Sequence, residues 1–198
     1  MKNKLCLLNG LLLTVFFCSN LFAQTDAFES GKSYLSVGYG LELYNASKIY
    51  VAEDKENYEY SGIGPITVKF EHGLGDEFGL GVVVGYSQSQ VQWTGNNGLE
   101  DYTYNFKFQK LTAVARMNWH FFTDEHWDAY GGIGVGYKSS TFSWDTNDTD
   151  YDQEEFNGLP AAMSFSMGAR YYFNPNIGLF FETGIGHGYM QAGLQAKF

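Results

Sequence analysis

Cysteine and proline are both scarce in this sequence. Only 2 of its 198 residues are Cys and only 3 are Pro. Both cysteines, Cys6 and Cys18, lie in an N-terminal segment that has the features of a signal peptide. Without that segment the chain has no thiol, which excludes a disulfide framework, a zinc–cysteine site and a cysteine nucleophile.

The N-terminal segment has the composition of an export signal. Lys2 and Lys4 precede an apolar run from Leu5 to Phe17, and Ala23 supplies a small residue at which a signal peptidase can cut. We therefore predict a Sec-type signal peptide over residues 1–23 and a single mature domain over residues 24–198.

Two other interpretations of this segment are weaker. A membrane-anchoring helix would be interrupted by Asn9 and Gly10, and no basic cluster follows it. A lipoprotein signal would carry its lipid on Cys18, but the bulky Phe17 immediately before that cysteine argues against it.

Basic residues are also few. The sequence has 12 Lys and Arg against 22 Asp and Glu, a formal net charge of −10, and removal of Lys2 and Lys4 moves this charge to −12. Nucleic-acid binding requires a basic surface that neutralises phosphates. The charge balance therefore excludes a nucleic-acid partner.

Long apolar runs are absent after residue 23. No run reaches the roughly 18 residues that a membrane-spanning helix needs. Alternation takes their place: in residues 34–44, Leu35, Val37, Tyr39 and Leu41 are separated by small or polar residues. A period of two predicts a strand with one apolar face.

The glycine-rich stretch YGGIGVG at residues 130–136 follows the same period. Ile133 and Val135 occupy one face, while Gly132, Gly134 and Gly136 occupy the other. A dinucleotide-binding turn would need the spacing G-x-G-x-x-G followed by a helical pattern, and neither occurs here. The stretch is therefore predicted to be a strand with its glycines on one side.

Eight alternating segments are predicted in all, at residues 34–44, 66–74, 78–87, 110–119, 127–138, 161–172, 177–186 and 190–198. Tight turns at 75–77, 123–126 and 174–176 alternate with long loops at 45–62, 88–105 and 143–158, and only the last outer loop, 186–188, is short. This pattern predicts an all-β fold, an eight-stranded antiparallel up-and-down transmembrane β-barrel. Phe106 and Phe108 fall out of phase with Leu111, which leaves open whether the fourth strand contains a bulge.

The polarity of the strands indicates which face points outward. The interior of an eight-stranded barrel is only just filled by side chains, so it cannot hold the whole bulky apolar set. That set must face lipid, with the glycines and charges inside. Six aromatic residues gather at the tight-turn ends, where an aromatic girdle would lie, although ordinary core aromatics are the alternative interpretation. They are Trp119, Phe121, Trp127, Tyr171, Phe173 and Phe198.

The C-terminal residues resemble a known assembly signal. Gln191, Gly193, Ala196 and Phe198 match a pattern of a polar residue, a glycine, an apolar residue and a terminal aromatic, although Ala196 is small for its position. In residues 30–198 the chain is similar to the small porin-like OmpX- and OmpA-type barrels of the Gram-negative cell envelope. This resemblance implies a bacterial outer-membrane location, contact with outer-membrane lipids and lipopolysaccharide, and insertion by the barrel-assembly machinery with periplasmic chaperones. It also implies that the long loops lie outside the cell, but it does not define an activity.

The predicted lumen contains charged residues of both signs. The acids are Glu42, Glu71, Asp128 and Glu182, and the bases are Lys69, Arg116, Lys138, Arg170 and Lys197. Because an unpaired charge in a low-dielectric lumen is costly, we expect these groups to neutralise one another as a structural plug. The alternative is a charged lining that conducts ions or small solutes through a narrow channel.

Two long loops suggest roles at the surface. The acidic loop 145–155 places Asp148, Asp150 and Asp152 at calcium-loop spacing, but Gln153 stands at the glycine position, so no metal site and no cofactor is predicted and weak divalent-ion binding is the alternative. The first long loop is rich in tyrosine, which suits contact with an extracellular protein partner. Both loops favour a structural or surface-interaction role.

A lipid A-modifying enzyme is the rival class. Small barrels of that kind use a histidine with a nearby serine, but His72 and His187 are each followed by glycine, and no His-x-Ser motif occurs. His120 and His126 are expected at a periplasmic turn, away from the outer leaflet. We therefore predict a protein without catalytic residues.

Overall fold

The computed structural model describes residues 26–41, 57–96, 101–147 and 154–198. The predicted signal peptide lies outside these ranges. Within them, no helix has the length and hydropathy needed to cross a membrane.

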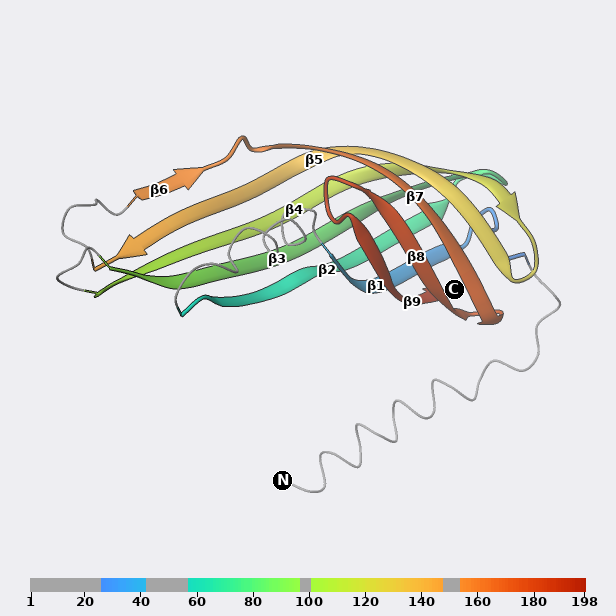
Figure 1. Ribbon diagram of the computed structural model, residues 1–198. Helices are drawn as coiled ribbons and strands as arrows, with labels where there is room; N and C mark the ends of the chain where they lie inside the picture. Colours follow the sequence, from blue (N-terminus) through green and yellow to red (C-terminus); the bar gives the residue numbers. More distant parts are fainter. Residues whose placement is uncertain (1–25, 42–56, 97–100, 148–153) are drawn as a thin grey trace, which may run out of the picture.

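Antiparallel strands form a closed barrel (Figure 1). The strands are β1 (Ser33–Leu41), β2 (Glu59–Gly73), β3 (Phe78–Asn96), β4 (Asp101–Thr123), β5 (Trp127–Thr146), β6 (Glu154–Asn157), β7 (Ala161–Asn174), β8 (Ile177–Ile185) and β9 (Met190–Lys197). Pairing of β1 with both β2 and β9, together with the β4–β5 pairing, closes a ring of eight strands, and the short β6 pairs with β5 outside it. The predicted eight-stranded fold is confirmed.

The three predicted tight turns are also confirmed. The turn between β4 and β5 is closed by Asp124, whose carboxylate accepts the backbone N–H groups of His126 at 2.8 Å and Trp127 at 2.7 Å. Donation from the Trp127 and His126 amides lowers the pKa of the Asp124 carboxyl. Asn174 closes the β7–β8 turn by accepting the N–H of Ile177 at 2.9 Å. Such Asx turns fix the register of the strands that they join.

The apolar residues of each strand point away from the lumen. Val37 is 52% exposed and Ile133 is 54% exposed, whereas their lumen-facing neighbours Ser36 and Gly132 are buried. The same holds for large side chains on every strand of the ring, among them Leu35, Val68, Phe70, Leu80, Val82, Met117, Val135, Met163, Phe165, Leu179, Phe181 and Leu194. These residues form a continuous apolar belt. The six aromatic residues predicted for the girdle are also exposed, at the tight-turn end of the belt.

Strands β2 to β5 extend beyond the other strands of the ring at the long-loop end (Figure 1). These extensions form a protruding sheet, made up of residues 59–63, 88–96, 101–109 and 139–146. Much of the expected loops 88–105 and 143–158 is therefore strand. β4 pairs with β5 without a shift from Tyr104 to His120, so no bulge occurs at Phe106 or Phe108. The bulge in this pair lies instead between His120 and Phe122.

Another feature explains why Phe106 and Phe108 alternate out of phase with Leu111. Since the register is continuous, residues at even positions of β4 share the lumen-facing side throughout, which places Phe106 and Phe108 on the same side as Arg116. On the outer side, Leu111 is followed upward by Gln109, whose amide donates to Gln88 Oε1 at 3.1 Å. The apolar residues thus change sides where the strand leaves the belt, because the outer side meets water above this height.

An aromatic ladder covers the inner side of the protruding sheet. It comprises Trp93, Tyr104, Phe106, Phe142 and Trp144. Trp93 stacks on Phe106 with ring centroids 4.9 Å apart. Trp144 packs edge-on against Phe106, with ring centroids 3.8 Å apart. Aromatic pairs of this kind stabilise neighbouring strands. The ladder gives the protruding sheet a small core of its own.

Candidate functional site: a charge network that fills the lumen

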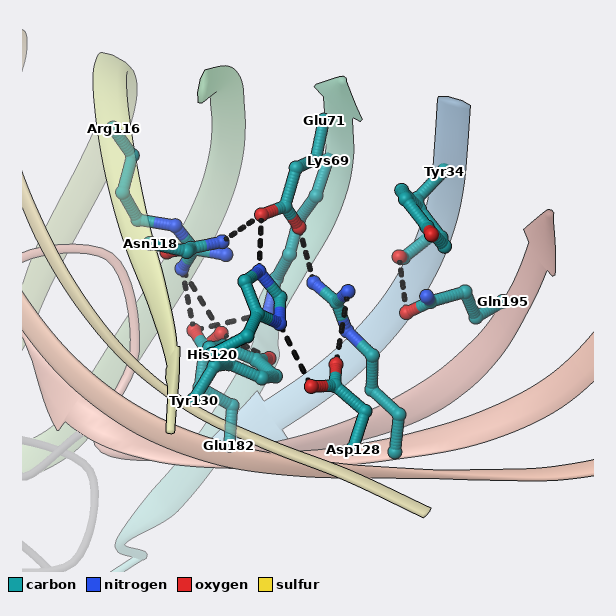
Figure 2. A network of polar contacts seen from close by, with 12 residues as sticks. Tyr34, Lys69, Glu71, Arg116, Asn118, His120, Asp128, Tyr130, Glu182 and Gln195 are labelled. Carbon is teal, nitrogen blue, oxygen red and sulfur yellow. Dashed lines mark hydrogen bonds and ion pairs between the residues drawn. The ribbon is translucent and has the colours of Figure 1, made fainter. Parts of the chain in front are cut away.

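Glu182 on β8 is the centre of the first half of the lumen network (Figure 2). Its carboxylate lies 2.9 Å from Lys69 Nζ and 2.9 Å from Arg116 Nη1. It also accepts the Tyr130 hydroxyl at 2.7 Å and is 2.9 Å from His187 Nε2. Glu182 is 0% exposed, so these contacts replace all of its hydration.

Glu71 and Asp128 organise the second half. Both carboxylates pair with Arg170, and Asp128 Oδ2 lies 3.2 Å from Arg170 Nη1. His120 lies between the same two carboxylates, 2.9 Å from Glu71 and 2.7 Å from Asp128 (Figure 2). Asn118 donates to Glu71 at 2.8 Å.

The two halves form one neutralised cluster. Three acids and three bases face one another across the lumen. Arg116 Nη1 reaches both oxygens of Glu182, and Arg170 reaches Glu71 with Nη2 and Asp128 with Nη1. All six of these side chains are at most 5% exposed. Burial at this level is tolerated because every charge has an opposite charge within hydrogen-bonding distance. The cluster therefore occupies the lumen with paired and buried charges.

The residues before β1 close the lumen at the tight-turn end. Ala27 and Phe28 are 0% and 2% exposed, and the Ala27 N–H donates to the Asp124 carbonyl at 2.6 Å. Glu29 pairs with Lys197 at 2.8 Å. This segment, residues 26–29, is here called the N-terminal cap. It adds an apolar seal beneath the charged cluster.

Phe180 completes the filling on the β8–β9 side. Its ring lies 4.1 Å from Lys69 Nζ, and the glycines beside it provide the room. A Cβ at Gly38 would come within 2.5 Å of the ring, and one at Gly193 within 2.8 Å. The lumen glycines of the sequence are thus explained in part by close approach of bulky inner side chains.

The structure brings together six of the nine charged residues assigned to the lumen from the sequence. They are Lys69, Glu71, Arg116, Asp128, Arg170 and Glu182. Lys197 lies at the opposite end of the lumen from the long loops, against the N-terminal cap, and Lys138 lines a cavity at the long-loop end. Glu42 lies outside the described residues, as do the calcium candidates Asp148, Asp150 and Asp152.

Two histidines of the network were not anticipated from the sequence. His120 was expected at a periplasmic turn, but it is 2% exposed inside the barrel. His187 was placed in the short outer loop, and it folds inward onto Glu182. Alternation along β4 could have predicted the position of His120, because it is an even-numbered residue on the same face as Arg116. His187 lies in a turn, where no alternation indicates which way a side chain points.

The histidine geometry bears on catalysis. Both ring nitrogens of His120 face carboxylates, which leaves neither to activate a serine. Ser33 Oγ lies 3.0 Å from His72 Nδ1, at the tight-turn end of β1 and β2. Across the described ranges, no three His, Cys, Asp or Glu side chains are arranged to hold a metal ion.

The residues matched to the assembly signal lie on the closing strand β9 and at its end. Gln191 points into the lumen, where it accepts from Thr67 Oγ1 at 2.7 Å and donates to Glu182 at 2.9 Å. Ala196 is half-buried on the outer side, and Phe198 is 61% exposed. The backbone of Phe198 bonds to Ser33 in both directions, at 2.8 and 2.9 Å. Phe198 thus joins the end of the last strand to the start of β1.

A closed antiparallel barrel with an apolar outer belt and a polar interior defines the class of protein. Closure gives each strand of the ring two hydrogen-bonded neighbours, as spanning a bilayer requires, and the belt is the surface that lipid would cover. The chain is a small eight-stranded barrel with the surface of a membrane-spanning protein.

Comparison with solved structures finds three bacterial proteins to which the chain is similar. The structure of Ail, the attachment invasion locus protein of Yersinia pestis, in complex with a heparin analogue matches 85% of this chain and 99% of its own, with 14% identity and a TM-score of 0.48. The N-terminal β-barrel domain of OprF from Pseudomonas aeruginosa matches 86% and 100%, with 12% identity and a TM-score of 0.44. OprG from the same organism matches 86% and 97%, with 12% identity and a TM-score of 0.43. No protein-family model and no curated protein matches the chain.

Proposed function

We propose that this barrel is a non-enzymatic structural and surface-interaction protein whose lumen is sealed. The observation that supports this proposal is the buried, neutralised cluster around Glu182 and Glu71, beneath which Phe28 closes the lumen. Moving an ion through this cross-section would require breaking several buried ion pairs, at several kcal/mol each.

The surface role falls to the long-loop end. There the protruding sheet offers polar side chains on its outer side, such as Gln88, Gln92 and Gln109, and the aromatic ladder on its inner side. Exposed polar and aromatic residues are typical of contact surfaces. Outer-membrane lipids, lipopolysaccharide and an extracellular protein are the partners that this surface suits.

The biogenesis route is part of the same proposal. Residues 1–23 direct export and are removed, periplasmic chaperones carry the chain, and the barrel-assembly machinery recognises Gln191, Gly193, Ala196 and Phe198 on the closing strand. Mass spectrometry of the protein isolated from outer membranes tests the first step, since the mature chain should begin at Gln24.

Single-channel recording tests the sealed lumen. The mature chain is refolded into a planar bilayer, and its insertion is verified by heat-modifiable mobility on gels. The expected result is a silent bilayer over a range of voltages. Stable and reproducible current steps would overturn the proposal in favour of a narrow porin-like channel, and a mass change in lipid A upon expression would favour an enzyme.

A further inference from the structure

One base assigned to the lumen from the sequence is left out of the charge network. Lys138 on β5 is half-buried, and within the described part of the chain its ammonium group has no carboxylate partner. It lines a cavity of about 410 Å³ at the long-loop end of the barrel, together with Phe108, Lys110 and Ser140. This is within the size range of small-ligand pockets, roughly 300–1,000 Å³.

The cavity brings two lysines to the same wall. β4 and β5 pair with Lys110 opposite Ser140 and Thr112 opposite Lys138, so the lysines are diagonal neighbours. Both lie at even positions of strands whose even residues face inward. Diagonal neighbours have Cα atoms about 7–8 Å apart, which allows two flexible ammonium groups to converge on one anion.

The remainder of the cavity is apolar. The buried Ala162 on β7, with Gly184 and Gly186, forms the opposite side, and the outward-facing Met163 and Ile185 border the cavity at its rim. An ion that is fully hydrated would gain little from this wall, whereas a ligand that carries an apolar group would bury that group there. The cavity therefore has one cationic side and one apolar side.

We propose that this cavity binds a small phosphate ester, with the phosphate between Lys110 and Lys138 and the apolar part of the ester against Ala162. Lysine binds phosphate as a compact charge, and two ammonium groups match the two negative charges of a phosphate monoester. The ester is either a free organic phosphate or the phosphorylated headgroup of a lipid. This inference depends on the proposed function in one respect, namely that the long-loop end, and with it the cavity, faces the outside of the cell.

Titration by NMR tests the site. ¹⁵N-labelled protein in phosphatidylcholine nanodiscs is titrated with phenyl phosphate, with phenol as the neutral control. We expect saturable shifts of amides in residues 138–140 and 184–189 with phenyl phosphate and none with phenol. Lys110→Gln and Lys138→Gln should each weaken binding about tenfold or more. Lys107→Gln, three residues from Lys110 and on the outer side of the same strand, should bind as wild type does.

The arms of the experiment separate the two sources. Shifts with phenyl phosphate indicate a free ester, and shifts that appear only in nanodiscs containing phosphatidic acid indicate a lipid headgroup. Lys110→Arg and Lys138→Arg should retain binding, which controls for misfolding of the glutamine variants. An absence of shifts in both arms, or shifts that persist in both glutamine variants, would overturn the site. A current in bilayers would overturn the sealed lumen and leave this site intact.

Discussion

Phe28 lies face to face with His120, with ring centroids 3.5 Å apart and planes 8° from parallel. One ring belongs to the N-terminal cap and the other to the centre of the charge network. The contact places an apolar face directly beneath the imidazole that separates Glu71 from Asp128. In the proposed sealed lumen, the cap would exclude water from the network at its tight-turn end, so the seal would depend on residues that precede the barrel.

The Phe28→Ala substitution should lower the free energy of unfolding by about 3 kcal/mol, because it removes a buried ring and exposes His120 to water. Urea unfolding in detergent micelles measures this change. Phe121→Ala, which alters a lipid-exposed ring, is the matched control and should cost less. Equal losses in the two variants would show that the cap does not seal the lumen.

Glu182→Gln should destabilise the barrel by about 3–5 kcal/mol, because Lys69 and Arg116 lose their shared counter-charge. The same unfolding measurement applies. Asp76→Asn, in an exposed turn, should change stability by less than about 0.5 kcal/mol. Adding Lys69→Met to Glu182→Gln should restore part of the loss, and a double variant that is less stable than the single one would contradict the ion-pair assignment.

Ile133→Arg places a charge in the apolar belt and should cost about 2–4 kcal/mol. Thr141→Arg, on the same face of β5 but opposite Gln109 in the protruding sheet, should cost less than about 1 kcal/mol. Refolding into phospholipid vesicles measures both. Similar costs at the two positions would mean that the bilayer boundary does not lie where the apolar residues change sides.

Trp144→Ala should loosen the protruding sheet without unfolding the barrel. Since Trp144 contacts Phe106, Tyr104 and Trp93, its loss should speed amide hydrogen exchange in residues 101–109 about tenfold, or about 1.4 kcal/mol. Amides of β8 and β9 should exchange as in wild type. Trp127→Ala, in the girdle, is the control and should leave residues 101–109 unchanged.

The barrel was predictable from the sequence because a lipid-facing strand must alternate. Ile133 and Val135 have to face outward whatever their neighbours are, so counting the alternating segments gave both the strand number and the apolar face. The same rule gave a wrong prediction in the protruding sheet. There Phe106 and Phe108 still alternate with polar residues, but they lie on the inner side of the sheet. Expecting a single apolar face along the whole strand assigned the extensions of β2, β3, β4 and β5 to loops.

The pairing inside the lumen was not predictable in the same way. Arg116 and Glu182 are 66 residues apart in the sequence, and Arg170 and Glu71 are 99 apart. Alternation shows that each faces inward, but which acid meets which base depends on barrel closure and on the height of each strand. The sequence therefore predicted the six acidic, lysine and arginine members of the network, while their partners and the two histidines, His120 and His187, required the structure.

The change of sides at Leu111 and Gln109 also fixes how deep the protein sits. Shifting the barrel outward by two residues would expose Leu111 to water, and shifting it inward would bury Gln109 and Gln88 in hydrocarbon, so displacement in either direction costs free energy. The protein therefore has one vertical position in the bilayer. The height of its protruding sheet above the membrane, and with it the distance at which another molecule can be touched, is set by the strands themselves.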